Sequence, residues 1–500
     1  MHYIPDIDST PFVGRQQELE LLDRLWKSPR AEFLILYGRR RVGKSRLLTH
    51  WFDTRKPRVL DWEASETNEY DLLRSFSQVI YNFRQLPTLA PRDFTYANWR
   101  QAFEELSELA KEERLAVFID EFTYILSVNP AIAGTLQHIW DHLLKHTNLL
   151  LVLSGSHLGM MQHHILSQKA PLYGRATAHL KLLPLPFGLT AQYYPGYQAD
   201  ERVAVYAMAG GVPFYWEKFF LPELSLDENI NNQFLSSNLL LHGEPSLMLS
   251  DYISDAHNYV AILRAISYQH RTPKEIAAFS GLDAKHVPAY LKNLIEIGLV
   301  ERHIPVTASA SSRMGRHHIW VPFLRFYYRF LSQRQRQLSG GVRQKALAEM
   351  RRHLRDFVAF TWEELCQHWL TQADTDRIPF LPDRVGSAWT RTAQVDVVGI
   401  NPMEKTLILG EAKWGKHPYD SQVLEQLVAK TDQFVSQRDR GRKKWRIFYL
   451  GFARNGWTGD ARAFADHFSK SNRHGENWSS AGMRLLDLIT IDQDLISWDV

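Results

Sequence analysis

The chain has 500 residues and a formal net charge of +4, which results from 59 basic and 55 acidic residues. At roughly 150 residues per domain, this length predicts about three domains. Hydrophobic residues make up 45% of the chain and charged residues 23%, which is typical of folded proteins and excludes wholesale disorder. The single cysteine, Cys366, excludes an internal disulfide and a cysteine-based zinc cluster.

The sequence shows no targeting or membrane-spanning pattern. The N-terminus has no charged segment followed by an apolar one, and the longest apolar runs, such as residues 149–153, are too short to cross a bilayer. We therefore expect a cytoplasmic protein with no membrane partner. The near-neutral charge of the whole chain permits nucleic-acid binding but does not argue for it.

Five short apolar runs alternate with helical patterns between about residues 15 and 190. They are residues 33–37, 58–62, 115–119, 149–153 and 179–183. Continuous apolar strands separated by amphipathic helices are typical of a parallel sheet that is covered on both faces. Residues 1–190 are therefore predicted to form an open α/β sheet.

The first run leads into a phosphate-binding loop, residues 38–45, of the form G-x-x-x-x-G-K-[ST]. Gly38 and Gly43 allow a tight turn whose N–H groups point at phosphate oxygens. Lys44 can reach the β and γ phosphates, and Ser45 can hold Mg²⁺ at the start of a helix. The other loop residues expected at the nucleotide are Arg41, Val42 and Arg46. This motif predicts ATP and Mg²⁺ as ligands.

Polar residues follow the later runs. Asp120 would lie at the carboxyl end of the third strand and bind Mg²⁺, and Glu121 would polarise the attacking water as general base. Ser154 ends the fourth run and could contact the γ-phosphate, although a strand-ending turn explains it equally well. Arg175 could stabilise charge in the transition state, in cis or on a neighbouring subunit, or be a solvated loop arginine.

The order of these motifs resembles that of the archaeal-type ATPases, AAA-like P-loop proteins related to the signal-transducing STAND class and to origin-recognition ATPases. The matching segments are residues 12–19, 38–45, 120–121, 154–156, 171–175 and 209–213. The resemblance implies that Val13, Gly14 and Arg15 lie near the base or ribose. It also implies that Gly210, Gly211 and Pro213 report the nucleotide state from a helical lid, residues 191–250.

Residues 251–340 are predicted to form a winged helix-turn-helix. The expected helices cover residues 259–266, 272–278 and 286–297, and the expected strands cover residues 299–303 and 316–321. The helix at 286–297 could bind DNA, but its charge is mild. In AAA-like ATPases the same module often serves as a structural lid or docking arm, so both interpretations stay open.

An arginine-rich stretch covers residues 325–355. Its basic residues are Arg325, Arg329, Arg334, Arg336, Arg343, Lys345, Arg351, Arg352 and Arg355. Such a run usually forms a solvated face or a connector. Because aromatic residues at 326–330 are interleaved with it, the stretch could instead follow a phosphate backbone, with double-stranded DNA as the favoured partner.

Residues 341–500 contain two strand patterns, 394–400 and 406–414, joined by a turn. In a regular hairpin about this turn, Asp396 lies opposite Glu411, and Lys413 points to the same face as Glu411. Two carboxylates can bind Mg²⁺, and a lysine can orient a nucleophile. A solvent-facing hairpin with no catalytic role would also carry such residues.

This D…E-x-K pattern resembles the restriction-endonuclease-like, or PD-(D/E)xK, nuclease superfamily. The resemblance implies that Glu363, or as second choice Glu364, supplies an extra carboxylate, and that Gln422 and Gln426 lie near the site. Val395 stands where the superfamily usually has proline. Archaeal-type ATPases frequently carry such a domain, which can also keep the fold while serving as a binding module.

Together these patterns predict an α/β P-loop core at 1–190, a helical lid at 191–250, a winged helix at 251–340 and an α/β nuclease-like domain at 341–500. The predicted function is an ATP-hydrolysing switch that controls a Mg²⁺-dependent DNA-cleaving or DNA-binding domain. The alternative is a non-nucleolytic signalling switch whose C-terminal domain is an interaction module. A homo-oligomer and a protein or nucleic-acid trigger are compatible with the sequence, which fixes neither.

Overall fold

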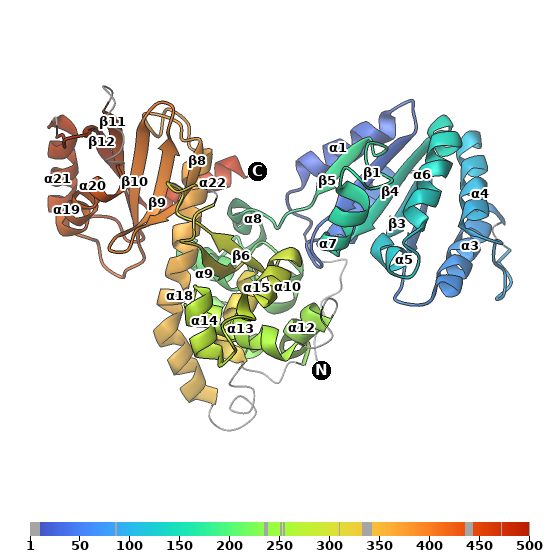
Figure 1. The fold of residues 1–500 in the computed structure, drawn as a ribbon, viewed down its shortest axis with the longest axis horizontal. Helices are drawn as coiled ribbons and strands as arrows, with labels where there is room; N and C mark the ends of the chain where they lie inside the picture. Colours follow the sequence, from blue (N-terminus) through green and yellow to red (C-terminus); the bar gives the residue numbers. More distant parts are fainter. Residues whose placement is uncertain are drawn as a thin grey trace. The chain divides into compact units, whose positions relative to one another are not determined.

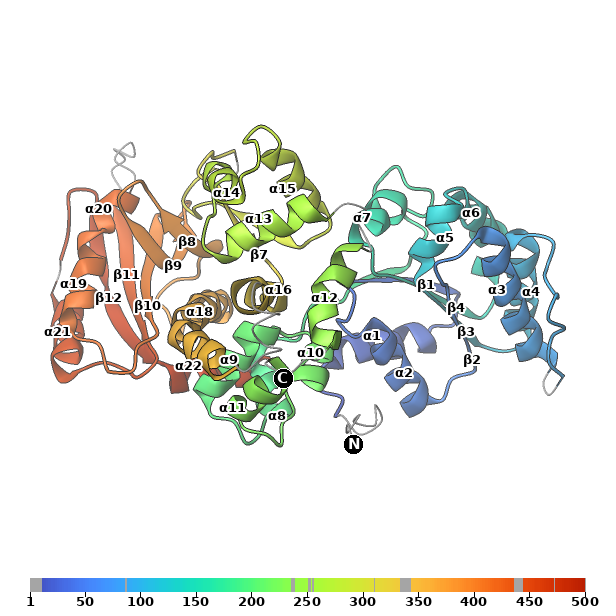
Figure 2. The same cartoon turned by 90° about the horizontal axis from the view of Figure 1, so that it is seen from below.

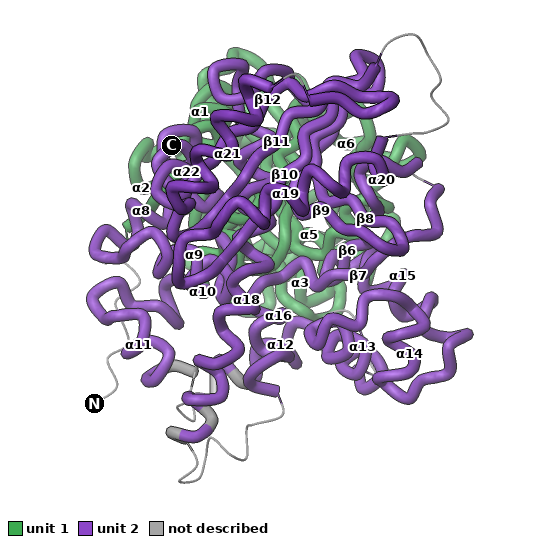
Figure 3. The backbone as a smooth tube through the Cα atoms, turned by 90° about the vertical axis from the view of Figure 1, so that its left-hand side faces the viewer, with its two compact units in different colours: residues 1–185, 212–214 green, residues 186–211, 215–500 purple. Residues whose placement is uncertain are grey.

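The computed structural model describes residues 11–499 except for 86–87, 235–238, 251–252, 254–255, 310, 333–342, 436–443 and 472 (Figure 1). The chain divides into two compact units (Figure 3). Unit 1 contains the residues up to Leu185 together with Val212–Phe214, and unit 2 contains Pro186–Gly211 and the residues from Tyr215 onwards. The four domain boundaries expected from the sequence stay a prediction.

Unit 1 is built on a five-stranded parallel sheet in the order β2-β3-β4-β1-β5. The strands are β1 (Glu32–Tyr37), β2 (Val59–Glu63), β3 (Leu115–Asp120), β4 (Leu149–Gly155) and β5 (Ala178–Lys181). Each strand falls on one of the five apolar runs, so the predicted open α/β sheet is confirmed.

Helices cover both faces of this sheet, which explains why its strands are apolar throughout. The helices of unit 1 are α1 (Gln16–Lys27), α2 (Lys44–Arg55), α3 (Glu69–Gln85), α4 (Trp99–Glu112), α5 (Phe122–Val128), α6 (Ile132–His142) and α7 (Leu158–Met161). Successive residues of β1 point to opposite faces. Leu34 and Leu36 pack with α1 and α2, whereas Phe33 and Ile35 pack with α3 to α6.

Unit 2 begins with short helices, followed by a helical module that ends in a hairpin. The first group is α8 (Thr190–Tyr193), α9 (Ala199–Ala209), α10 (Pro213–Phe219, of which Pro213 and Phe214 are counted with unit 1), α11 (Leu226–Asn229) and α12 (Leu239–Ser250). The second is α13 (His257–Ser267), α14 (Pro273–Ser280), α15 (Val287–Glu296) and the antiparallel strands β6 (Val300–His303) and β7 (Arg316–Ile319). These are the helices and strands from which a winged helix was predicted.

The aromatic residues of the arginine-rich stretch belong to the core. Phe326, Tyr327, Tyr328 and Phe330 are buried in and after α16 (Pro322–Phe326), and the Arg325 guanidinium is buried with them. The interpretation that these rings alternate with arginines along a phosphate backbone is therefore wrong. Arg334 and Arg336 lie outside the described residues.

The C-terminal part of unit 2 contains a mixed sheet in the order β12-β11-β10-β9-β8. Its strands are β8 (Arg384–Trp389), β9 (Gln394–Asn401), β10 (Thr406–Lys413), β11 (Trp445–Ala453) and β12 (Trp478–Asp487). Strands β10, β11 and β12 are parallel, whereas β8, β9 and β10 form an antiparallel meander.

Helices lie on both sides of the mixed sheet (Figure 2). They are α18 (Arg343–Gln372) on one side and α19 (Ser421–Ala429), α20 (Thr431–Phe434) and α21 (Gly459–Lys470) on the other. Among the described residues, we find no helix with the length and apolar character that a membrane span requires.

The last helix, α22 (Leu488–Trp498), ties the C-terminal sheet to the segment before α9 and to α9 itself. Asp492 of α22 accepts a hydrogen bond from the guanidinium of Arg202 of α9, and both side chains are almost completely buried. The N–H of Gly188 donates to the Asp499 carboxylate at 2.8 Å. Apart from Val212–Phe214, the described residues expected to form the lid therefore share one compact unit with the C-terminal sheet.

We predict that Asp492→Ala lowers the free energy of unfolding by about 3–5 kcal/mol, because the Arg202 guanidinium stays buried without its counter-charge. Urea unfolding followed by tryptophan fluorescence measures this change. Asp466→Ala, at an exposed position on α21, is the control and should alter the free energy by less than about 0.5 kcal/mol. Equal unfolding midpoints for Asp492→Ala and wild type would contradict the prediction.

Candidate functional site

The phosphate loop connects β1 to α2, and its glycines are required by its geometry. A Cβ on Gly38 would lie 2.5 Å from the carbonyl oxygen of Leu182, closer than any side chain can come. Gly43 has a φ of +95°, in the region that favours glycine, and Arg41 also has a positive φ of 72°. The loop thus adopts a tight turn that directs the start of α2 at any bound anion.

Lys44 is buried at the start of α2. Its Nζ donates to the carbonyl oxygens of Gly38 at 3.3 Å and Arg39 at 3.4 Å, and lies 3.8 Å from Glu121 Oε1. Burial lowers the pKa of Lys44, while Glu121 and Asp120 oppose that shift. A buried ammonium group that contacts mainly carbonyl oxygens is suited to bind phosphate oxygens.

The two carboxylates after β3 lie beside the loop. Ser45 Oγ donates to Asp120 Oδ2 at 2.5 Å, which brings together the two groups expected to hold Mg²⁺. Glu63, at the end of β2, is the register partner of Asp120. Burial raises the pKa of Glu63, and Asp120 and Glu121 raise it further. The donor set of hydroxyl and carboxylate oxygens fits Mg²⁺, whose charge would offset these carboxylates.

Glu121 is held by a residue that sequence reasoning did not choose. Its Oε2 accepts from the backbone N–H of Ser156 at 3.1 Å and from Ser156 Oγ at 2.8 Å. Ser154, the predicted γ-phosphate contact, is fully buried, and its hydroxyl has no hydrogen-bond partner among the described residues. The hydroxyl is thus enclosed by protein, and its contact with the γ-phosphate stays a prediction.

Residues 13–15 precede the phosphate loop in the sequence, and one of them contacts the backbone of the loop. Gly14 and Arg15 both have positive φ angles, and Val13 precedes them in a partly buried position. The Arg15 guanidinium donates to the carbonyl oxygens of Val42 at 3.1 Å and Leu183 at 2.7 Å. The structure thus brings Arg15 to the loop backbone.

Residues at the start of α10 also reach the loop. A Cβ on Gly43 would lie 3.8 Å from Cγ of Pro213, and the Arg41 guanidinium lies 4.0 Å above the ring of Phe214. Arg46 occupies the first turn of α2. The segment Val212–Phe214 is accordingly counted with unit 1, although the rest of α10 belongs to unit 2.

Arg175 is bound to α6. Its guanidinium donates to the Asp141 carboxylate at 3.2 Å and to the carbonyl oxygen of Tyr173 at 3.3 Å. The structure does not bring Arg175 together with Lys44 and Glu121 by any hydrogen bond or ion pair found in the described part of the chain. A role at the nucleotide would require release from Asp141.

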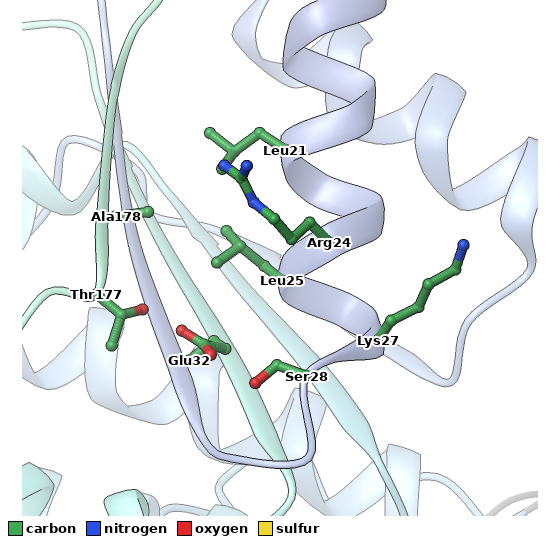
Figure 4. Close-up of a pocket in the computed structure, with 8 residues that line it drawn as sticks. All are labelled: Leu21, Arg24, Leu25, Lys27, Ser28, Glu32, Thr177 and Ala178. Carbon is green, nitrogen blue, oxygen red and sulfur yellow. The ribbon is translucent and has the colours of Figure 1, made fainter.

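A pocket of about 670 Å³ lies elsewhere in unit 1 (Figure 4). Its lining residues are Leu21, Arg24, Leu25, Lys27, Ser28, Glu32, Thr177 and Ala178. They come from the end of α1 and from the amino ends of β1 and β5. Ligands of open α/β sheets bind at the carboxyl ends of the strands, where the phosphate loop begins, so this pocket is separate from the nucleotide site.

A second cluster of charged residues lies on β9 and β10. The register pairs Val397 with Gly410, so Asp396 and Glu411, the next residues along the two strands, face each other as predicted. Each is 8% exposed. The Lys413 ammonium lies 2.7 Å from Glu411 Oε1. The backbone N–H of Ala412 donates to Asp396 Oδ2 at 3.2 Å.

Lys430, which follows α19, completes the cluster. Its ammonium lies 2.9 Å from Glu411 Oε2, so both oxygens of this carboxylate contact a lysine. The glutamines expected near the site, Gln422 and Gln426, are exposed on α19. A lysine at the end of the same helix therefore occupies the neighbourhood predicted for them, and no sequence motif marks it.

Burial strongly raises the pKa values of two acidic residues of this cluster. It raises the pKa of Asp396 to about 6, with Glu411 adding to the shift, and the pKa of Glu363 to about 8, with Asp396 adding to the shift. Burial lowers the pKa of Lys413, but its contact with Glu411 more than offsets this, and the net shift is upward. A divalent cation would favour the ionised carboxylates.

The adjacent glutamates Glu363 and Glu364 of α18 have different surroundings. Glu364 forms an ion pair with the buried Arg325, at 3.2 Å for each of its oxygens, so the second-choice residue holds α18 to α16. Glu363 is the one that interacts electrostatically with Asp396. Cys366, nearby on α18, is fully buried and belongs to the core.

Among the described residues no group of three or more histidine, cysteine, aspartate or glutamate side chains has the arrangement of a metal site. At the second cluster, a metal would therefore be held by Asp396 and Glu411, with water or substrate as its remaining ligands. Carboxylate oxygens with open positions are the ligands that Mg²⁺ accepts.

Sequence comparison shows similarity between known proteins and the part of the chain that contains the phosphate loop. Residues 12–219 match a family described as an ATPase domain predominantly from Archaea, and residues 327–427 match a family described as Archaea bacterial proteins of unknown function. An uncharacterized ATP-binding protein of Methanocaldococcus jannaschii is 49% identical over 45 residues, which are 9% of this chain and 76% of that protein.

Two longer similarities cover most of the chain. A Walker-type ATPase of Pyrococcus abyssi has a TM-score of 0.49 and 20% identity, and the match covers 64% of this chain and 96% of that one. An uncharacterized protein of M. jannaschii is 30% identical over 405 residues, which are 81% of this chain and 87% of that protein. Because this last match spans more than four fifths of both sequences, the chain belongs to the same family as that protein, and residues 12–219 give it the P-loop ATPase domain found predominantly in Archaea.

Proposed function

We propose that the chain is an ATP-hydrolysing switch that controls a Mg²⁺-dependent nucleic-acid-cleaving domain, with double-stranded DNA as its substrate. The observation that carries the nuclease part is the convergence of Asp396, Glu411 and Lys413 on facing strands. The P-loop cluster supports the ATPase part.

At the P-loop, Lys44 would exchange its contacts with backbone carbonyl oxygens for the β and γ phosphates, and Ser45 and Asp120 would hold Mg²⁺, whose charge would offset that of the phosphates. Ser156 fixes the carboxylate of Glu121 so that its free oxygen accepts a proton from the attacking water. Val13 and Gly14 lie toward the base or ribose, Ser154 contacts the γ-phosphate, and Pro213 reports its presence.

At the second cluster, Asp396 and Glu411 would hold Mg²⁺, and the ion would polarise a water molecule and offset the charge of the scissile phosphate. Lys413 leaves Glu411 to stabilise the charge that develops on the phosphate oxygens. Glu363, whose carboxyl pKa is raised by burial and by Asp396, would donate a proton there. A restriction-endonuclease-like fold is supported by the mixed sheet and by the position of Glu363 on α18.

Contacts inside unit 2 support control of this cluster by the lid. Asp200, in the first turn of α9, forms an ion pair with Arg454, whose guanidinium lies 4.9 Å above the ring of Trp414. Trp414 directly follows Lys413 and packs on Trp362, with 5.5 Å between ring centres. A displacement of α9 would therefore move the residues that adjoin both Lys413 and Glu363.

The module from α13 to β7 is proposed to be a winged helix that serves as a scaffold. Three polar side chains of α15 contact other residues of the same module. Asn258 donates to the Tyr290 hydroxyl and Asn293 donates to the Tyr259 hydroxyl, each at 2.8 Å. Lys292 pairs with Glu296 at 3.7 Å.

A second candidate function is a non-nucleolytic switch whose C-terminal domain binds a partner. It is favoured by the two lysines on Glu411, because their ammonium groups already neutralise the carboxylate and compete with a metal ion for its oxygens. In this case the cluster would only stabilise the sheet.

We predict that Ser156→Ala lowers the rate of ATP hydrolysis about 10-fold while ATP affinity stays within twofold. The reason is that Glu121 loses a hydrogen bond to a charged group, worth about 1.5 kcal/mol. Steady-state phosphate release and ATP titrations measure both effects. Lys44→Ala should abolish ATP binding, and Ser127→Ala, an exposed serine on α5, should change neither property. A Ser156→Ala chain with wild-type turnover would contradict the role of Ser156.

We predict that the wild-type chain cleaves plasmid DNA with Mg²⁺ in an ATP-dependent manner and that Lys413→Ala lowers cleavage about 100-fold or more. Lys430→Ala should also lower it, because Glu411 loses a neighbour that holds its second oxygen. Lys416→Ala, at an exposed position three residues away from Lys413, is the matched control and should cleave normally.

Agarose electrophoresis over a time course measures this cleavage, with linear, supercoiled and single-stranded DNA and RNA as substrates. If wild type and Lys413→Ala are equally inactive on every substrate with and without ATP, the nuclease proposal fails and the binding-module alternative is favoured.

A further inference from the structure

The connection between β6 and β7 packs on the edge strand of the C-terminal sheet. The N–H of Val306 donates to the carbonyl oxygen of Ser387 on β8 at 3.0 Å, and Trp389 Nε1 donates to the carbonyl oxygen of Met314 at 3.2 Å. The predicted wing is therefore bound to the sheet that carries Asp396.

Arg316, the first residue of β7, is fixed by two residues of this sheet. Its guanidinium lies 4.4 Å above the ring of Trp389, and its Nη1 donates to Gln394 Oε1 at 2.9 Å. Trp389 and Gln394 are register partners on β8 and β9. The planar guanidinium thus contacts both members of one cross-strand pair, an arrangement that lysine could not reproduce.

The bond to Arg316 determines how Gln394 faces the site. A guanidinium can only donate hydrogen bonds, so it requires the amide oxygen of Gln394 and turns the amide N–H₂ group the other way. That group points at Asp396, with 3.5 Å between Nε2 and Oδ1. With the amide reversed, two oxygens would oppose each other at this distance.

We propose that Arg316 is a positioning residue of the C-terminal site, which acts through Gln394 to orient the Asp396 carboxylate for a divalent metal. Oδ2 of Asp396 is already held by the N–H of Ala412, so the amide of Gln394 fixes the other oxygen and completes the orientation. The predicted winged helix thereby contributes to the site from a separate part of the chain. This inference rests on the proposed metal-binding function of Asp396 and Glu411.

The test measures Mn²⁺ binding to the full-length chain by isothermal titration calorimetry without nucleotide, and then cleavage of DNA. Arg316→Met keeps the stem of the side chain but removes the donors, and Gln394→Leu removes the amide. Each should weaken Mn²⁺ binding roughly 10-fold, as expected for a group that orients a metal ligand. Because Arg316 acts through Gln394, the double variant should bind no more weakly than the weaker single variant, within twofold.

Arg313→Met, at an exposed position in the same connection, is the matched control and should bind Mn²⁺ like wild type. Wild-type affinity in Arg316→Met, or additive losses in the double variant, would overturn the positioning role whether or not DNA is cut. Equal Mn²⁺ binding by wild type and Asp396→Asn would overturn both this role and the metal site. Weakened, non-additive binding in a chain that cuts no substrate would support the positioning role and refute only the nuclease function.

Discussion

The buried ion pair between Arg202 and Asp492 sets the organisation of unit 2, on which the proposed control depends. Two charges removed from water are stable only while they stay in contact, so the pair holds α9 and α22 together. Through it, the segment expected to act as a lid is part of the same unit as the C-terminal sheet. In the proposed function, a change in the position of α9 would act on the C-terminal cluster through the contact of Asp200 with Arg454 and that of Arg454 with Trp414.

Both candidate sites contain a carboxylate that is bound to lysine. Glu121 lies near Lys44 at the P-loop, and Glu411 contacts Lys413 and Lys430 in the C-terminal sheet. In each site the lysine ammonium can exchange its contact with the carboxylate for a contact with a phosphate oxygen, because both groups are anions that accept hydrogen bonds from an ammonium. Ligand binding would then release the carboxylate for chemistry or for a metal ion. A contact between a lysine and a carboxylate is thus a feature of the candidate sites in both sheets.

Features that depend on local spacing could be predicted from the sequence. The five strands of the first sheet follow from apolar runs, and the facing positions of Asp396 and Glu411 follow from the length of one turn. Contacts between distant segments could not be predicted. Nothing in the spacing distinguishes Ser156 from Ser154 or points to Lys430. The arginine-rich pattern predicts a solvated position for Arg325, because its partner, Glu364, lies on another helix and only the fold shows that Arg325 is buried.

The central claim is that the nucleotide state reaches the C-terminal sheet through α10 and α9. Hydrogen–deuterium exchange of the full-length chain, with and without a non-hydrolysable ATP analogue, tests it most directly. Binding should change amide protection in residues 38–45 and also in the peptides that contain α9 and α22, and the last two should change together. A change confined to residues 11–185, with unaltered exchange in α9 and α22, would contradict the account.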